Sequence, residues 1–143
     1  MQEIAEFTAN NPWLVSGLIA SALAVIFNEL RLKSQEVSAL STVMAVRLIN
    51  DGGSVVDIRD SKKFTNAHII DAHNIVEKEL TQDTSLLDKF KKTILLVCDN
   101  GGRSGECATR LRKGGIDRVY SLKGGLQAWQ QENLPVSSHK NQD

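Results

Sequence analysis

The first thirty residues of the chain are far more apolar than the rest. No charged residue lies between Glu6 and Glu29, and only small polar residues interrupt the apolar run that begins at Trp13. A helix of about 20 mostly apolar residues is long enough to cross a lipid bilayer. We therefore expect one transmembrane helix over about residues 10–29, inside an N-terminal membrane anchor of residues 1–33.

Two other structures could produce the same apolar run. A cleaved signal peptide begins with positive charge, whereas this chain begins with Glu3 and Glu6 and has no Lys or Arg before Arg31. A buried core helix would need a second apolar segment of similar width to cover it, and the sequence has none. Arg31 and Lys33 follow the run, so the positive-inside rule places the rest of the chain in the cytoplasm.

Short apolar runs alternate with helical segments in the rest of the chain, which we take as one domain of residues 34–136. Strands are predicted over residues 54–58, 93–97 and 118–122. Helices are predicted over residues 42–50, 86–90, 104–113 and 125–132. This alternation predicts an α/β fold, a parallel sheet flanked by helices on both faces. Residues 137–143 are short and polar, and we expect them to form a flexible tail.

The composition excludes several classes of function. Seventeen Lys and Arg residues balance seventeen Asp and Glu residues, so the net charge gives no reason to expect a nucleic-acid partner. Two Cys residues are too few for a disulfide-stabilised mini-protein. Together with three His residues they form no zinc-binding pattern, so no metal site is expected.

One loop combines the residues that an activated thiol requires. Cys98 follows the most apolar predicted strand, and ligand sites in parallel sheets form beyond the carboxyl ends of strands. The nucleophilic form of cysteine is the thiolate, which the unpaired N–H groups at a helix start stabilise. Glycines let the backbone turn such groups inward, and an Arg can anchor the loop or hold an anionic part of a substrate. The loop residues are Asp99, Asn100, Gly101, Gly102, Arg103 and Ser104.

A structural cysteine followed by an ordinary glycine turn would use some of the same residues. The Cys-x-x-Gly-x-Arg-Ser pattern at a predicted strand–helix junction favours the functional interpretation for Cys98. Cys107, on the helix that follows, is expected to pack as a small buried residue. Asp57 and Arg59 end another predicted strand, and we expect them to form a supporting polar pair near the site.

Four segments of the domain resemble the rhodanese family, and one of them, residues 64–74, is similar to the family's segment around a His-Ile pair. Residues 98–104 are similar to its active loop, a Cys followed by four residues, an Arg and then Ser or Thr. Residues 55–59 are similar to its strand that ends in Asp-x-Arg, and residues 124–129 to its Gly-Gly-x-x-Ala-Trp motif. The resemblance covers about residues 37–136. With the apolar N-terminus, the whole chain is similar to the membrane-anchored, single-domain bacterial members.

The resemblance implies a rhodanese-like fold and a rhodanese-type sulfurtransferase in the bacterial inner membrane. Cys98 would take the outer sulfur of thiosulfate, or of a protein or small-molecule persulfide, and pass it to a thiol or another thiophilic acceptor. No cofactor is implied. The alternative is a membrane-tethered protein-binding or sulfur-carrier module with little thiosulfate turnover, for which a membrane protein is the expected partner.

Two positions depart from the family pattern. Ala67 and Asp71 stand where the family has glycines around its His-Ile pair, so we expect that turn to be built differently. Asp99 follows the nucleophile, where many active members carry a basic or neutral residue. A carboxylate at this position is expected to repel a dianionic donor, which would favour a persulfide over thiosulfate.

Phosphatase chemistry is the nearest rival activity, because it also places a Cys and an Arg around an anion-binding loop. The related cell-cycle phosphatases have one more residue between the two than the four that separate Cys98 from Arg103. A phosphoryl group is larger than a sulfur atom and needs that room, so the spacing disfavours phosphate transfer.

Overall fold

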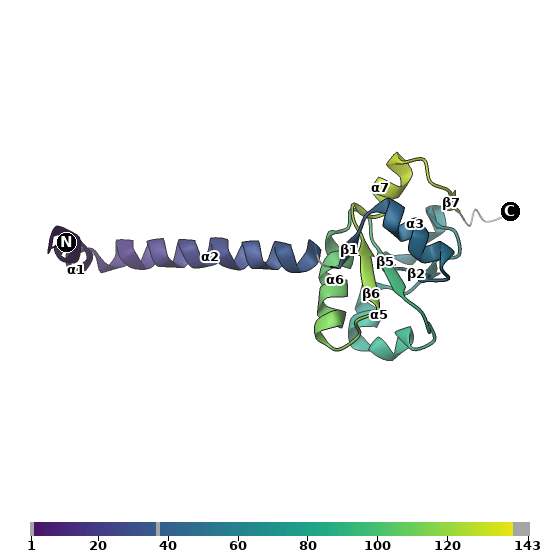
Figure 1. The fold of residues 1–143 in the computed structure, drawn as a ribbon, viewed down its shortest axis with the longest axis horizontal. Helices are drawn as coiled ribbons and strands as arrows, with labels where there is room; N and C mark the ends of the chain where they lie inside the picture. Colours follow the sequence, from purple (N-terminus) through teal and green to yellow (C-terminus); the bar gives the residue numbers. More distant parts are fainter. Residues whose placement is uncertain (1, 37, 139–143) are drawn as a thin grey trace. The chain divides into compact units, whose positions relative to one another are not determined.

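The computed structural model describes residues 2–36 and 38–138, and the chain divides into two compact units. The first unit, Met1–Ser34, holds helix α1 (Gln2–Asn10) and most of helix α2 (Pro12–Glu36). The second unit, Gln35–Asp143, holds all the strands and the remaining helices. Figure 1 labels the elements of both units.

Helix α2 is long and apolar enough to cross a membrane. Its apolar stretch is Pro12–Arg31, with a mean hydropathy of 1.7 and none of the stretch buried inside the structure. Trp13 is 71% exposed and Leu18 is 73% exposed, so water would meet large apolar side chains along this helix. Pro12 begins the helix, where its missing N–H costs no hydrogen bond. Length and composition of this kind are shared by signal sequences, so membrane insertion stays a prediction.

The second unit is built on a five-stranded parallel sheet with the strand order β1-β6-β5-β2-β4. The strands are β1 (Ala39–Leu40), β2 (Ser54–Asp57), β4 (His73–Asn74), β5 (Ile94–Val97) and β6 (Val119–Leu122). All four residues of the central strand β5 are fully buried, because both faces of the sheet are covered. The predicted α/β fold with a parallel sheet is confirmed.

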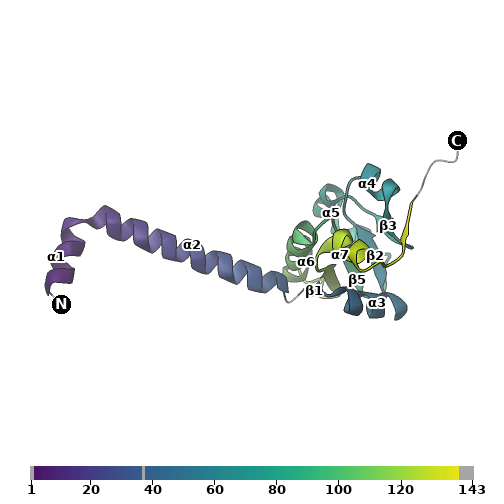
Figure 2. The same cartoon turned by 90° about the horizontal axis from the view of Figure 1, so that it is seen from above.

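Successive residues of each strand point to opposite faces of the sheet, and each face packs into its own hydrophobic core. Val56 and Leu96 pack with the core under α5 (Glu77–Gln82) and α6 (Gly102–Lys113). Val55 and its neighbours on the opposite face pack with the core under α3 (Thr42–Asn50) and α7 (Gly125–Gln131). Figures 1 and 2 show these two helical layers on either side of the sheet.

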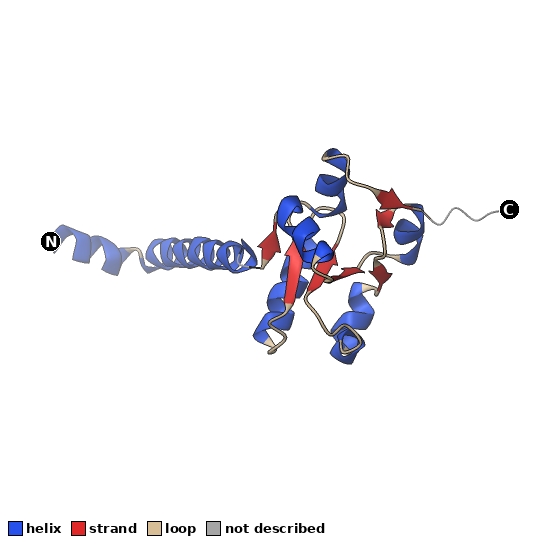
Figure 3. Ribbon diagram, turned by 45° about the vertical axis from the view of Figure 1, so that its right-hand side comes forward, coloured by secondary structure: helices blue, strands red, loops and turns tan. Residues whose placement is uncertain are grey.

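The structure corrects several predicted elements. Residues 86–90 were expected to form a helix, whereas the 3₁₀ helix η1 covers Thr84–Leu87 and α5 precedes it. Helix α4 (Ser61–Asn66) and the small sheet of β3 (His68–Ile69) and β7 (Val136–Ser137) were not predicted. Figure 3 shows this small sheet apart from the main one. Elements this short are held by tertiary contacts, and their sequences carry no periodicity to reveal them.

Ser137, which was expected to belong to a flexible tail, lies in a strand instead. Ser137 pairs with His68 in the antiparallel β3–β7 sheet, and residues 139–143 lie outside the described residues. In the turn after β3, Asp71 adopts a φ of 60°, a left-handed conformation that glycine adopts more readily and Asp tolerates. The turn therefore keeps a left-handed residue although the sequence has no glycine at that position.

Candidate active site

Cys98 lies at the carboxyl edge of the sheet, directly after the buried strand β5. The loop runs from Cys98 to Gly101, which is the N-cap of α6 and has a φ of 90°. The predicted strand–loop–helix junction is therefore present. It places the start of a twelve-residue helix beside the cysteine, where the first N–H groups of the helix have no partner within the helix.

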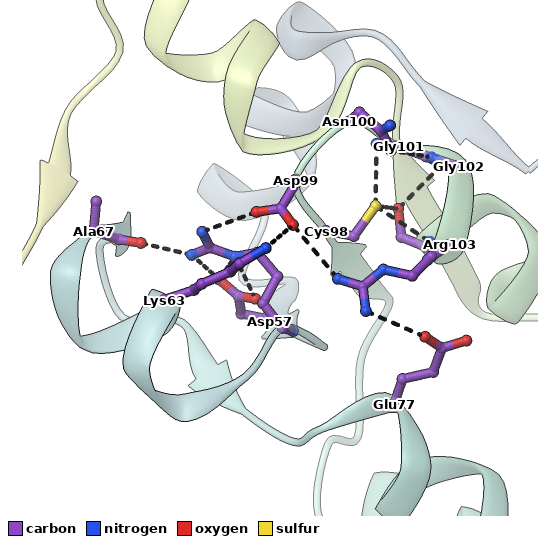
Figure 4. Close-up of polar contacts among 12 residues, drawn as sticks. Asp57, Lys63, Ala67, Glu77, Cys98, Asp99, Asn100, Gly101, Gly102 and Arg103 are labelled. Carbon is purple, nitrogen blue, oxygen red and sulfur yellow. Dashed lines mark hydrogen bonds and ion pairs between the residues drawn. The ribbon is translucent and has the colours of Figure 1, made fainter.

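The Cys98 sulfur is surrounded by hydrogen-bonding groups from its own loop. The Gly101 N–H donates to Sγ at 3.1 Å and the Ser104 N–H at 3.4 Å. The Ser104 hydroxyl lies 3.2 Å from the same sulfur. Figure 4 shows Cys98 and Gly101 side by side in this loop. Donors converging on one atom stabilise negative charge there, as a thiolate or a persulfide anion requires. The side chain of Cys98 has no exposed surface in this conformation.

Not every loop N–H points at the sulfur. The Gly102 N–H donates instead to the Asn100 side-chain oxygen at 3.1 Å. Asn100 therefore shapes the loop by pairing with its backbone, and the sulfur receives its N–H donors from Gly101 and Ser104. The spacing of the loop residues alone does not show which of their N–H groups point at the Cys98 sulfur.

The first residues of α7 hold the Cys98 loop in place through backbone hydrogen bonds. The Leu126 N–H donates to the Cys98 carbonyl at 2.8 Å, and the Gln127 N–H donates to the Asp99 carbonyl at 3.0 Å. A Cβ atom on Gly125 would lie 2.4 Å from the Cys98 carbonyl oxygen, so the two backbones meet where only glycine fits. The Gly-Gly motif that carried part of the family resemblance thus has a direct physical role at the site.

Asp57 and Arg59 form a buried ion pair at the end of β2. The Arg59 Nη2 lies 2.7 Å from Asp57 Oδ2, Nε lies 3.0 Å from Oδ1, and the Arg59 backbone N–H also donates to Oδ1. The two side chains are 5% and 1% exposed. Arg59 Nη2 also donates to the Ala67 carbonyl at 2.6 Å, which connects β2 to the segment before β3. Burial alone would lower the pKa of Arg59, and its hydrogen bonds and charge contacts with Asp57 and Asp99 raise that pKa overall.

The Asp99 carboxylate lies among three cations. Lys63 Nζ is 2.8 Å from Oδ2, and Arg59 Nη1 and Arg103 Nη2 each lie 3.5 Å from one of its oxygens (Figure 4). The hydrogen bond from Lys63 is the largest cause that lowers the pKa of Asp99. The carboxylate that was expected to repel a dianionic donor is therefore paired with three cations, and its effect on the donor stays a prediction. Lys63 was not predicted as a site residue. It lies on α4, 36 residues before Asp99, and no sequence spacing connects the two positions.

Arg103 is held between two carboxylates. Its guanidinium lies 3.5 Å from Asp99 and 3.7 Å from Glu77 at the start of α5, and its side chain is half exposed. Glu77 also lies 3.8 Å from Arg110 on α6. Glu77 was not predicted as a site residue, because the helix α5 that it begins was itself not predicted. These two ion pairs hold the Arg103 side chain beside the loop, as the anchoring role requires.

Cys107 packs within the core that α6 covers. Its side chain is 1% exposed, and burial raises the pKa of its thiol, so the neutral form is favoured. His68 is also occupied locally, because its Nδ1 lies 2.7 Å from the Phe64 carbonyl and its ring stacks on the Phe64 ring. Neither residue therefore stands as a second reactive group beside Cys98.

Comparison with known proteins gives two curated relatives of particular interest. The chain is 33% identical over 139 residues to the uncharacterized protein YibN of Escherichia coli K12, and the match covers 95% of this chain and 97% of that protein. It is 30% identical over 106 residues to the thiosulfate sulfurtransferase GlpE of Actinobacillus pleuropneumoniae serotype 3, over 73% of this chain and 97% of that protein.

Solved structures show the same fold. A rhodanese-related protein from Thermoplasma volcanium superposes with a TM-score of 0.63 at 24% identity, over 69% of this chain and 96% of that chain. A thiosulfate sulfurtransferase from Pseudomonas aeruginosa superposes with a TM-score of 0.67 at 18% identity, over 80% of this chain and 22% of that chain. The model of the rhodanese-like domain matches residues 42–132, which include β2, the Cys98 loop and α7. The chain belongs to the family of rhodanese-like domains.

Proposed function

We propose that this chain is a rhodanese-type sulfurtransferase that carries sulfane sulfur as a persulfide on Cys98. One observation carries the proposal: the Gly101 and Ser104 N–H groups both point at the Cys98 sulfur, at 3.1 and 3.4 Å. A loop of this kind stabilises the anionic sulfur before and after transfer. The relative GlpE, whose name gives it thiosulfate sulfurtransferase activity, supports the same reaction class.

The reaction has two displacement steps. The Cys98 thiolate attacks the outer sulfur of the donor, and the sulfur–sulfur bond of the donor breaks. Its electron pair leaves on sulfite when the donor is thiosulfate, or on a thiolate when the donor is a persulfide. An acceptor thiolate then attacks the outer sulfur of the Cys98 persulfide and restores the Cys98 thiolate. Neither step takes electrons from outside the two reactants.

The position of the sulfur limits how a donor reaches it. Cys98 is fully buried in this structure, so side chains at the mouth of the loop must move before a donor sulfur arrives. Four residues separate Cys98 from Arg103, one fewer than in the related cell-cycle phosphatases, and the shorter loop suits a single transferred sulfur atom. Turnover of a small aryl phosphate by the chain would contradict this proposal in favour of phosphatase chemistry.

Persulfide formation tests the proposal directly. The full chain in detergent, fully reduced, is mixed with thiosulfate or with a small alkyl persulfide, and its intact mass is measured. We expect a gain of one sulfur atom in the natural chain and in the control variant Cys107→Ser, which keeps Cys98. The gain should be absent in Cys98→Ser, because serine oxygen does not form a persulfide.

The alternative is a tethered carrier or binding module, favoured by the burial of Cys98 and by the ion pairs around Asp99. Loading from the alkyl persulfide alone would identify a sulfur carrier with little thiosulfate turnover. Loading from neither donor, with the fold intact, would favour a module that binds protein partners.

We also propose that α2 anchors the chain in the inner membrane of a bacterium with the rhodanese-like domain in the cytoplasm. Arg31 is the last residue of the apolar stretch and Lys33 follows it, as the positive-inside rule requires for this orientation. Protease added to sealed inside-out vesicles should digest the domain, and protease added to right-side-out vesicles should leave it intact. Protection in the inside-out vesicles would contradict the orientation, and loss of the chain from the membrane fraction would contradict the anchor.

A further inference from the structure

The cations beside the Cys98 loop already have an anion among them. Arg59, Lys63 and Arg103 come from three different segments of the chain, and each has a nitrogen within 3.5 Å of an Asp99 carboxylate oxygen. Lys63 and Arg103 are 53% and 47% exposed, whereas Arg59 is 5% exposed, so Lys63 and Arg103 are the cations of this group that are open to an anionic donor beside the nucleophile loop. The carboxylate therefore stands where the charged group of such a donor would bind.

We propose that Asp99 determines the donor specificity of this site: its carboxylate occupies the cations that a dianionic donor needs, and so selects persulfides over thiosulfate. This inference rests on the sulfurtransferase activity proposed above. It differs from simple repulsion by the Asp99 charge, because the effect of Asp99 depends on the cations that it binds.

The charges around the loop support this assignment. Arg59 is already paired with Asp57, and Glu77 lies between Arg103 and Arg110. In these ion pairs four cations face three carboxylates, so the cluster carries one net positive charge. Without Asp99 it would carry two, which is the charge that balances a dianion such as thiosulfate. Lys63 would be freed most completely, because Asp99 is its ion-pair partner at 2.8 Å.

The two donor classes give the same product on Cys98 and differ in their own charge and in their leaving group. Cys98 forms the same persulfide with either donor, while the leaving group is the sulfite dianion in one case and a thiolate in the other. Thiosulfate must displace the Asp99 carboxylate from Lys63 and Arg103 to find compensating charge. A persulfide carries at most one negative charge, so it needs less compensating charge from the cation cluster than thiosulfate does.

The variant Asp99→Asn removes the charge and keeps the shape of the side chain. We expect the second-order rate constant for loading of Cys98 by thiosulfate to rise about tenfold, because partly exposed ion pairs at this distance are weakened but not abolished by solvent. Loading by hydroxyethyl persulfide, whose alkyl group is uncharged, should change less than about threefold. Both rates come from intact masses of the full chain at several donor concentrations, and persulfide loading shows that the variant site is intact.

A double-mutant cycle with Lys63→Met tests the dependence on the cation. If Asp99 acts by occupying Lys63, the gain in thiosulfate loading from Asp99→Asn should largely disappear when Lys63 is also replaced. If Asp99 acted by repulsion alone, the gain would be the same with and without Lys63. The variant Asp88→Asn is the matched control, because this exposed carboxylate precedes β5 at the opposite edge of the sheet and should leave the donor preference unchanged.

The outcomes separate this inference from the function on which it rests. A natural chain that loads from neither donor overturns the sulfurtransferase proposal, and the specificity inference with it. A natural chain that loads from the persulfide, with no higher thiosulfate-to-persulfide ratio in Asp99→Asn, overturns the inference alone. A gain in Asp99→Asn that Lys63→Met leaves unchanged also overturns it.

Discussion

Replacing Arg59 with methionine is expected to lower the free energy of unfolding by about 3–5 kcal/mol, because the change leaves a buried carboxylate without its cation. Asp57 is 1% exposed and would lose the three hydrogen bonds that it accepts from the Arg59 side chain, the shortest at 2.7 Å. The Ala67 carbonyl would lose a donor as well. Urea unfolding of the chain in detergent measures the effect as a lower midpoint at an unchanged slope.

Two further variants show whether the loss comes from the broken pair. The double variant Asp57→Asn with Arg59→Met carries no unpaired charge, so its cost should be smaller than the sum of the two single costs. The exposed Arg47 on α3 is a control for the loss of an arginine, and Arg47→Met should change stability by no more than about 0.5 kcal/mol. A cost for Arg59→Met similar to that of Arg47→Met would refute the structural importance of the pair.

The variant Gly125→Ala should destabilise the domain by about 2–4 kcal/mol, through both a steric clash and an unfavourable backbone conformation. Gly125 has a φ of 59°, and its Cβ would lie 2.4 Å from the Cys98 carbonyl oxygen and 2.7 Å from the Asn100 nitrogen. Relief of the clash must move the Cys98 loop, since backbone atoms cannot rotate aside. A shift of about 1 Å at a reacting group costs about a hundredfold in rate, so persulfide loading should fall by that order.

Gly115 provides the matched control for this variant. Its φ of 97° is equally unfavourable for alanine, but a Cβ there meets nothing within 4 Å. Gly115→Ala should therefore cost only the backbone strain, about 1–2 kcal/mol, and leave persulfide loading unchanged. If Gly125→Ala costs no more than Gly115→Ala and loads sulfur at the same rate, the close approach of the two loops does not constrain the site.

The parts of the fold that the sequence predicts are those with strong local patterns. Residues 94–97 are apolar on both faces, which is typical of a central strand, and the structure buries all four completely. The strands β1, β3, β4 and β7 have only two residues each, and pairing partners far away in the chain decide them. No periodicity exists over two residues, so these strands are out of reach of pattern analysis.

The candidate site divides in the same way. The Cys98 loop was predicted because its residues are consecutive and glycines before a helix start have a known role, whereas Ser104 does not cap the helix, since the N-cap is Gly101. Lys63 and Glu77 were missed because charged residues on exposed helices are common and show nothing of their partners. The structure therefore adds what the sequence could not show of Asp99, namely the three cations that pair with its carboxylate.

The complete burial of the Cys98 side chain should lengthen the lifetime of a persulfide formed on it. Over-oxidation of cysteine to sulfinic and sulfonic acids follows the exposure of the thiolate, and peroxide dissolved in water attacks accessible sulfur first. An enclosed persulfide would be shielded from such oxidants and from stray thiols that would discharge it. Hydrogen peroxide should therefore oxidise the Cys98 persulfide more slowly than it oxidises a free alkyl persulfide. Slow oxidation would allow the chain to store sulfur between encounters with its acceptor.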